Sequence, residues 1–251
     1  MSGHSKWATI KHKKAATDAK RGSLFTKLIK EITVAARGGG KPDTNPRLRV
    51  AIERAKEASM PADNIERAVK KGTGELEGVS YEDIALEGYG PGGVAIFVEG
   101  VSDNRNRTTS EVRTIFTKKG GNMAGAGSVS WMFVKKGYIL IEKSQAKEDE
   151  LMTIALEAGA EDFKSDDKNF EITTSVQDLE KVKQAIQDKG IKWQDAELTM
   201  IPSSSVKVAG NEAKQVLSLV EALEEHDDVQ QVYANFDIPD EILEQMASAE
   251  E

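Results

Sequence analysis

The spacing of apolar residues changes near residue 75, and this change limits the fold more than any other feature of the chain. Before it, apolar residues recur at three- and four-residue intervals, as on one face of a helix. From Tyr81 onward, β-branched runs between glycine-rich turns replace that pattern and predict strands. Helices followed by mixed strands and helices are typical of an α+β multidomain protein.

Residues 3–22, here called the leader, carry six Lys or Arg and one acid. A helix over residues 6–21 would place the basic residues on about half of its circumference and alanines on the other side. A face of alanines buries little apolar area, so we expect a partner to order this segment. Gly22 is expected to end the helix.

Three further helices are predicted before residue 75. Ser23 is suited to cap a helix that runs through Ala36. Proline favours the first position of a helix, so the next two helices are expected at Pro46 and Pro61, and Gly72 is expected to stop the last. The first 75 residues are therefore predicted to be helical.

Strand patterns dominate the rest of the chain. Two strands joined by a Gly/Pro turn are predicted within residues 81–100, followed by a helix whose capping box begins at Thr108, and by a strand over residues 128–134. After Gly137 the order is βαββαβ, the split βαβ pattern. A last helix and strand near residues 216–233 are expected to complete the first sheet, and Pro239 opens a tail helix.

The predicted fold class is α+β multidomain. It has a basic N-terminal helical domain and two α/β-sandwich (ferredoxin-like) domains, the third inserted in the second. The predicted boundaries are residues 1–77 for the helical domain, 78–136 plus 204–251 for the discontinuous α+β domain, and 137–203 for the inserted domain.

Charge divides the chain at about the same place. Residues 1–74 carry 17 Lys or Arg and 7 Asp or Glu, whereas residues 75–251 carry 17 basic and 35 acidic residues. A basic end suits a polyanion and an acidic body does not. Trp7 lies among lysines, where it could stack on a base or a ribose. The leader is therefore predicted to bind nucleic acid; the alternative is a helix face that is only solvated.

The sequence contains no pattern that argues for catalysis. The glycines of residues 88–93 precede a strand, not the helix that a nucleotide-binding fingerprint requires. The chain has no cysteine, and its three histidines lack the neighbours of a metal site. The acids of residues 224–228 are interpreted as a solvated helix end. We expect no enzymatic activity, no metal, no cofactor and no small-molecule substrate.

Arg105 and Arg107 follow a turn-forming Asp-Asn pair and lie just before the predicted helix. The free N–H groups at a helix start attract anions. Two interpretations stay open: both arginines pair with nearby acids and fix the turn, or they contact an anion or RNA.

Membrane and export signals are weak. The longest aliphatic or aromatic run, residues 94–98, is far shorter than the roughly 20 residues that cross a bilayer. The start has no apolar stretch of the kind found in secretory signals. We expect a cytoplasmic protein without a membrane partner; a mitochondrial presequence, which is also basic and poor in acids, is the alternative.

Several long segments resemble the YebC family of bacterial and organellar proteins. They are "GHSKWATIKHKKAATDAKRG", "NPRLR", "EGYGPGGVAIFVEGVSDNRNRT", "GGNMAGAGSVSWMF", "EAGAED", "MIP" and "VQQVYANFDI". The resemblance runs from end to end and implies three domains, with the third inserted in the second. It also implies a nonenzymatic role in gene expression: members are described as DNA-binding transcriptional regulators, and mitochondrial relatives as translational activators of cytochrome c oxidase subunit I.

The resemblance also marks site residues. Met123 stands where we expect leucine in the family, which affects packing only. With Trp7, the candidate nucleic-acid-binding residues are Lys6, Lys11, His12, Lys13, Lys14, Lys20, Arg21, Arg105 and Arg107.

The leading prediction is a nucleic-acid-binding regulator of gene expression, with DNA as its target. The alternative is a ribosome-associated translation factor that contacts ribosomal or messenger RNA. No helix-turn-helix with a polar reading face is evident in the sequence, which weakens sequence-specific DNA readout. An RNA target explains the same charge without base readout.

Reversing the charge of Lys11, Lys13 and Lys14 to Glu tests the leader. We expect weaker binding to any nucleic acid, and a plot of log K against log salt that is shallower by about one unit per lost phosphate contact. Fluorescence anisotropy at several salt concentrations measures this slope. An unchanged slope would show that these lysines do not touch phosphate. Stability should change by no more than about 0.5 kcal/mol.

Overall fold

The structure is a computed structural model that describes residues 18–239 and residue 242. The described chain forms two compact units, one of residues 131–205 and one of residues 18–130 with 206–239. Helices and antiparallel sheets make up both α/β parts, which confirms the predicted fold class. In the described ranges, no helix is long and apolar enough to cross a membrane.

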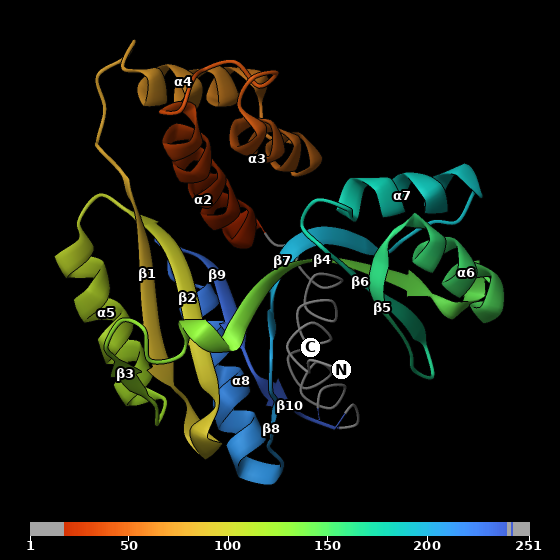
Figure 1. The fold of residues 1–251 in the computed structure, drawn as a ribbon. Coiled ribbons are helices and arrows are strands. Elements are labelled where there is room, and N and C mark those ends of the chain that lie inside the picture. Colours follow the sequence, from red (N-terminus) through yellow and green to blue (C-terminus); the bar gives the residue numbers. More distant parts are fainter. Residues whose placement is uncertain (1–17, 240–241, 243–251) are drawn as a thin grey trace. The chain divides into compact units, whose positions relative to one another are not determined.

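Three helices open the larger unit: α2 (Asp18–Ala36), α3 (Pro46–Glu57) and α4 (Ala62–Thr73) (Figure 1). Pro46 occupies the first turn of α3, as predicted, and the Asn45 side chain caps this helix by accepting a hydrogen bond from the Leu48 N–H. The apolar faces of the three helices share one core. Its buried members are Leu28, Ile32, Ala35, Ala36, Leu48, Ala51, Ala55, Met60, Ile65 and Ala68.

Helix α2 runs through Gly22, so the prediction that this glycine ends a helix is wrong. An exposed glycine inside a helix costs about 1 kcal/mol relative to alanine, less than the burial of one large aliphatic side chain contributes. The buried face from Leu28 to Ala36 therefore outweighs the effect of Gly22. Ser23 does not cap a helix; its hydroxyl donates to Asp227 Oδ1 at 2.9 Å.

Helix α4 also continues past its predicted end at Gly72. The C-cap is Gly74, which has a left-handed backbone conformation. Gly72 lies against α2: a Cβ added there would be 2.3 Å from the Thr33 carbonyl oxygen and 2.6 Å from the Ala36 Cβ. Gly72 therefore permits the close approach of α2 and α4 and does not terminate a helix.

The larger unit also holds a four-stranded antiparallel sheet in the order β3-β1-β2-β9. As predicted, a Gly/Pro turn joins the first two strands. The last helix and strand return to this sheet, since β9 pairs with β2 and Val98 lies opposite Val232. Helices α5 and α8 pack against the sheet and against each other, and β8 pairs with β10 in parallel. The bounds are β1 (Glu82–Tyr89), β2 (Ala95–Ser102), α5 (Arg105–Lys118), β3 (Asn122–Ala124), β8 (Val206–Lys207), α8 (Gly210–Glu224), β9 (Val229–Ala234) and β10 (Phe236–Asp237).

Helix α5 begins at Arg105, one turn earlier than predicted. Its cap is Asn104, whose side chain accepts a hydrogen bond from the Arg107 N–H at 3.1 Å. The capping box at Thr108 is wrong, because this side chain is buried and its hydroxyl contacts Asp228. Arg105 and Arg107 consequently lie inside the first turn of α5 and not before it.

The strand predicted over residues 128–134 is also wrong. Strand β4 (Phe133–Glu142) starts later and runs through Gly137, and a short 3-10 turn precedes it. The Glu87 carboxylate accepts the N–H groups of Val129 and Ser130, so these groups are not available to a neighbouring strand. The short strand β3 was not predicted; Met123 lies in it, opposite Gly88.

The smaller unit has the predicted βαββαβ order. Its sheet has the strand order β5-β6-β4-β7 with antiparallel neighbours, as in ferredoxin-like folds. Helices α6 and α7 pack together over one face of the sheet (Figure 1), where Ile139, Ile141 and Ile172 are fully buried. The remaining bounds are α6 (Glu148–Ala158), β5 (Ala160–Ser165), β6 (Asn169–Thr174), α7 (Leu179–Asp188) and β7 (Asp195–Pro202).

The boundaries predicted for three domains stay a prediction. The tail helix predicted after Pro239 lies almost entirely outside the described residues.

Replacing Gly72 with Ala tests the contact of α2 with α4. We expect a loss of about 1–3 kcal/mol, because the new methyl group overlaps the Thr33 carbonyl. Gly22→Ala is the matched control: it lies on an exposed helix position with no atom near the new methyl group and should stabilise by up to about 1 kcal/mol. Urea unfolding followed by circular dichroism measures both. Equal effects of the two substitutions would contradict the assigned role of Gly72.

Candidate nucleic-acid interface

A buried carboxylate joins the helices of the N-terminal region to the first sheet. Asp228, directly before β9, is only 2% exposed. Its Oδ1 accepts a hydrogen bond from Lys30 Nζ of α2 at 2.5 Å, and its Oδ2 accepts one from Arg107 Nη2 of α5 at 2.7 Å. Thr108 of α5 donates its hydroxyl to the same Oδ2. One side chain therefore fixes α2, α5 and the start of β9 to one another.

The contacts of Asp228 keep it ionised. Burial alone would raise its pKa, but the hydrogen bonds from Lys30, Thr108 and Arg107 outweigh burial and hold the pKa well below its usual range. The hydrogen bond from Arg107 to Asp228, together with a second one from Arg107 to Asp103 at 2.8 Å, raises the pKa of the Arg107 guanidinium. Lys30 and Asp228 are buried, so these two charges depend on each other, whereas the Arg107 side chain remains 43% exposed.

Further contacts fasten α2 along the turn between α8 and β9. Lys27 Nζ donates to the Glu224 carbonyl, and Lys30 Nζ also donates to the Asp227 carbonyl at 3.0 Å. Together with the Ser23 contact, these bonds show that the acidic run of residues 224–228 is an attachment surface for α2. The interpretation of this run as a solvated helix end is therefore wrong for Asp228.

Arg47 forms a second connection of the same kind. From α3 it donates to Glu31 of α2 at 2.9 Å and, with two nitrogens, to Asp83 of β1 at 2.7 and 2.9 Å. These hydrogen bonds raise the pKa of Arg47 and lower that of Asp83. The helical region thus contacts the sheet at two sites, through Asp228 and through Arg47.

His226 lies beside the Asp228 cluster. Its Nδ1 accepts the Asp228 backbone N–H at 3.1 Å, and its Nε2 lies 2.9 Å from Glu111 Oε2. Ligand-type atoms of Glu111, His226 and Asp228 lie within 4.8 Å of one another. Because both His226 nitrogens and both Asp228 oxygens already have hydrogen-bond partners, this geometry is explained without an ion and we assign no metal to it.

The two predicted arginines have different surroundings. Arg107 contacts Asp103 and Asp228, with Glu111 at 3.9 Å, which is the structural interpretation left open by the sequence. Arg105 is exposed at the first position of α5, and within the described residues it has no hydrogen bond or ion pair. Of this pair, only Arg105 is available to an anion without breaking a protein contact.

The other candidate residues belong to the leader. Lys20 and Arg21 are in the first turn of α2, and at 1.5 Å per residue Lys20 is about 15 Å along the helix from Lys30. The start of α2 is therefore attached, through Lys30, to the carboxylate that also holds Arg107. Six candidates lie outside the described residues: Lys6, Trp7, Lys11, His12, Lys13 and Lys14.

Sequence reasoning missed Lys30 and Asp228. Each of the two residues lies in a stretch of sequence whose charged residues are typical of an exposed surface. They are also 198 positions apart in the chain, so the sequence does not indicate that they meet. A partial signal exists for Lys30, which falls among the apolar positions Leu28, Ile29 and Ile32 of an amphipathic helix. A lysine at the edge of an apolar face either extends its ammonium group into water or, if buried, needs an acidic partner, and the sequence identifies neither the burial of Lys30 nor its partner.

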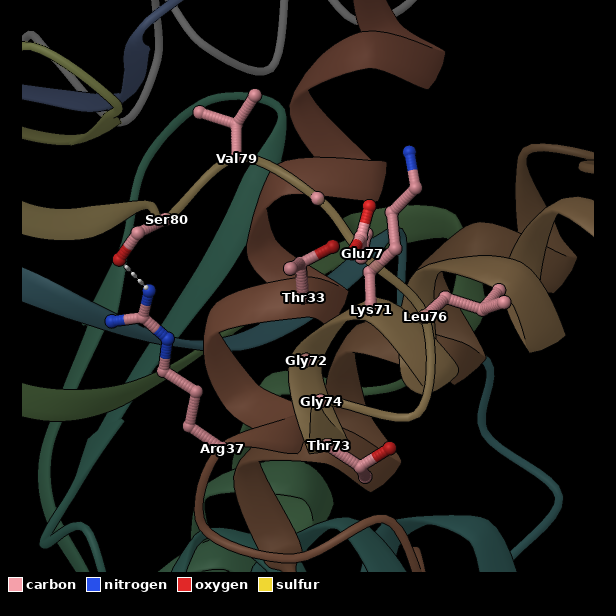
Figure 2. A pocket seen from close by; sticks show the side chains of 11 residues that line it. Thr33, Arg37, Lys71, Gly72, Thr73, Gly74, Leu76, Glu77, Val79 and Ser80 are labelled. Carbon is pink, nitrogen blue, oxygen red and sulfur yellow. Dashed lines mark hydrogen bonds between the residues drawn. The ribbon is translucent and has the colours of Figure 1, made fainter.

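A pocket of about 650 Å³ lies where α2 and α4 end. Figure 2 shows Arg37 at one side of it, donating to Ser80 Oγ at 2.8 Å, and Lys71 and Glu77 elsewhere on the wall. Two cations and one acid give the lining the charge that suits an anion. The carbonyl ends of two helices point toward this region and oppose an anion, so we assign no ligand to the pocket.

The fold and this interface define a class of protein: a cationic helical region joined to an α+β sheet by one buried ion pair and by exposed ones. The chain belongs to the TACO1/YebC family. Residues 5–75 match the TACO1/YebC protein N-terminal domain, and residues 81–236 match the TACO1/YebC second and third domain. The resemblance seen in the sequence is thereby confirmed.

Similar proteins extend over nearly the whole chain. A protein of Natranaerobius thermophilus is 61% identical over 97% of this chain and 99% of its own length, and one of Dictyoglomus turgidum is 58% identical over 98% and 100%. Both are named probable transcriptional regulatory protein. The crystal structure of a conserved hypothetical protein, Aq1575 from Aquifex aeolicus, is similar with a TM-score of 0.78 and 52% identity, covering 90% of this chain and 94% of that one. At the family level, the chain therefore groups with proteins named as regulators.

Replacing Asp228 with Asn tests the central cluster. At about pH 7 we expect a loss of about 3 kcal/mol, because Lys30 is left buried without its carboxylate. The folded-state pKa of Asp228 lies below the unfolded value of about 4, so its contribution is complete above that value and declines as the pH falls below it. The difference in the free energy of unfolding between the wild type and Asp228→Asn should thus become smaller as the pH falls toward about 3.

Asp227→Asn is the matched control, because Asp227 is exposed and contributes one side-chain hydrogen bond to Ser23. It should cost no more than about 1 kcal/mol. Urea unfolding at a series of pH values measures both variants. If the free energy of unfolding of Asp228→Asn differs from that of the wild type by the same amount at neutral and acidic pH, the charge of Asp228 does not stabilise the fold.

Proposed function

We propose that the protein is a nonenzymatic, cytoplasmic regulator of gene expression that binds nucleic acid through its cationic helical region. The observation that carries this proposal is the separation of net charge along the chain, together with the ion pairs that join α2 and α3 to the first sheet. Net positive charge lies before residue 75 and net negative charge after it, and Asp228 and Arg47 join the helices α2 and α3 to the first sheet. A polyanion is attracted to the net positive region and repelled by net negative surface, so we expect it to bind the helical region.

The described helices add cations to those of the leader. Several lysines and arginines on α3, on α4 and in the loop before α3 are exposed, and no ion pair engages them in the described part of the chain. They are Lys41, Arg49, Lys56 and Arg67. Cations without acidic partners remain available to phosphate groups, which supply most of the affinity in nonspecific nucleic-acid binding.

DNA is the first target that we propose, because the relatives carry names that refer to transcription. Asp228 brings Arg105 and the start of α2 onto one connected scaffold, so a duplex on α2 is within reach of α5. The second candidate is a ribosome-associated translation factor. An exposed arginine on the acidic body favours it, since a ribosome can surround the protein and engage two weak sites together, with a gain from effective concentration.

Replacing Arg105 with Ala distinguishes these targets. For a DNA regulator we expect weaker binding to a short duplex and a salt dependence shallower by about one unit. Reduced cosedimentation with ribosomes, with duplex binding unchanged, would instead select the second candidate. Binding to both targets at wild-type strength would remove Arg105 from either interface.

Arg107→Ala provides the structural comparison. We expect it to lower stability by roughly 1–3 kcal/mol through the loss of its bonds to Asp228 and Asp103, whereas Arg105→Ala should leave the melting curve unchanged. The leader charge reversal is compared with a variant of the acidic body in which Lys181, Lys189 and Lys192, all exposed, become Glu. If both charge reversals weaken binding equally, net charge and not the leader determines affinity, and the proposed function fails.

A further inference from the structure

Helix α5 is basic, although it belongs to the acidic part of the chain. It carries four Lys or Arg and one acid, Glu111, whereas residues 75–251 together carry 17 basic and 35 acidic residues. The Glu111 carboxylate lies 2.9 Å from His226 Nε2 and 3.9 Å from Arg107 Nε, so it already has partners. The charges of the remaining cations on α5 are therefore not compensated from within the helix.

One side of α5 is polar and exposed along most of its length. At about 100° per residue, a stripe roughly 60° wide holds the exposed residues Asn106, Ser110, Arg113 and Thr117. The buried residues Thr108, Val112 and Phe116 lie on another side of the helix. The stripe is roughly 17 Å long, because its ends are eleven residues apart and each residue rises about 1.5 Å. Figure 1 shows α5 at the left margin of the larger unit, beside β1 and β3.

The cations on this side of α5 lack acidic partners. Among the described residues, neither Arg113 nor Lys118 in the next turn forms an ion pair, and both side chains are exposed. Lys119, the C-cap of α5, donates to the Ser218 hydroxyl at 2.7 Å, a neutral group that leaves the ammonium charge uncompensated. Three positive charges at the C-terminal half of α5 are thus available to an anionic ligand.

Uncharged hydrogen-bonding groups accompany these cations. The side chains of Asn106 and Ser110 are exposed, and within the part of the chain that the structure describes neither forms a hydrogen bond. Arginine, lysine, serine and asparagine are side chains that contact phosphate oxygens in complexes with nucleic acids. The exposed side of α5 therefore combines positive charge with neutral donors in a single row.

We propose that the exposed side of α5, here called the α5 surface and formed by Asn106, Ser110, Arg113 and Lys118, binds the phosphate backbone of a nucleic acid. It is a second site, in addition to the cationic helical region. An acidic protein would also attract the cations, but a straight row of separate donors roughly 17 Å long suits a polymer with regularly spaced phosphates. That length equals about five base pairs at about 3.4 Å each.

The α5 surface and the helical region belong to one compact unit. Lys30 of α2 and Arg107 of α5 both donate to Asp228, so the two helices are held at a fixed separation. A nucleic acid that contacts both sites gains affinity from effective concentration. The inference rests on the proposed function in that nucleic acid is the ligand, and it adds a second place of contact.

The affinity test uses the full chain with a DNA duplex and an RNA duplex of about 30 base pairs, roughly 100 Å of B-DNA. We expect the double variant Arg113→Gln, Lys118→Gln to bind about 10- to 50-fold more weakly near 0.15 M salt, because each lost phosphate contact costs about fivefold there. The plot of log K against log salt should become shallower by about two units. A loss with either duplex supports the proposal and identifies the nucleic acid that the surface contacts.

The matched control removes two charges elsewhere. Lys181→Gln, Lys189→Gln changes two exposed lysines of the smaller unit and should leave the affinity for both duplexes within about twofold. Melting curves of both double variants should match the wild type, since all four side chains are exposed.

The neutral donors are tested separately. We expect Asn106→Ala and Ser110→Ala each to weaken binding by about 2- to 10-fold without changing the salt dependence, because each removes an uncharged hydrogen bond. If only the loss of charge weakens binding, the proposal stands with the cations as the phosphate contacts.

Two outcomes would overturn the inference. If the α5 double variant binds both duplexes with the affinity and salt dependence of the wild type, the α5 surface is only solvated or serves a protein partner. If the control variant loses as much affinity as the α5 variant, net charge and not the α5 surface is responsible. The leader charge reversal keeps the two proposals separate. If it abolishes binding while the α5 variant changes nothing, the proposed function stands and this inference fails; if it has no effect while the α5 variant weakens binding, the helical region is not the main site and the proposed function fails.

Discussion

The carboxylate of Asp228 is buried between α2, α5 and β9, and the arrangement of the larger unit depends on it. Lys30 loses most of its hydration on approaching it, and the Lys30 charge is compensated there by the ionised carboxylate. The result is a connection with defined geometry, because two cations and a hydroxyl converge on two oxygen atoms. An apolar contact of the same size would permit sliding; this cluster does not.

In the proposed function, this connection matters for how the charged regions of the larger unit meet a polyanion. Cations on a freely attached segment would bind a polyanion with no preferred orientation relative to the acidic body. With α2 fastened along residues 224–230, the start of α2 and Arg105 at the start of α5 belong to one scaffold. The membership of the chain in the TACO1/YebC family and the names of its relatives agree with a role in regulation, and the binding of nucleic acid by this scaffold is what we propose.

Most helices and strands could be predicted from spacing alone, and the errors have a common cause. The ends placed at Gly22, Gly72 and Thr108 are wrong, as is the strand over residues 128–134. At three of these places a long-range contact determines the local structure: α2 packs on α4 at Gly72, Asp228 accepts the Thr108 hydroxyl, and Glu87 accepts the N–H groups of Val129 and Ser130. At Gly22, the buried face of α2 that follows outweighs the glycine. Local propensity has no information about such partners.

The sequence by itself determined the fold class, the βαββαβ order after Gly137, the division of charge and the resemblance to the family, because these depend on composition and on regular spacing. It also identified Arg105 and Arg107 but not the difference between them. Only the tertiary structure decided that Arg107 is held by Asp228 while Arg105 is exposed, that Lys30 is buried, and that Glu87 fixes a distant loop. Each of those facts depends on a contact between residues that are far apart in the chain. The role of a buried charge depends on its partner, and the sequence does not say which residue that partner is.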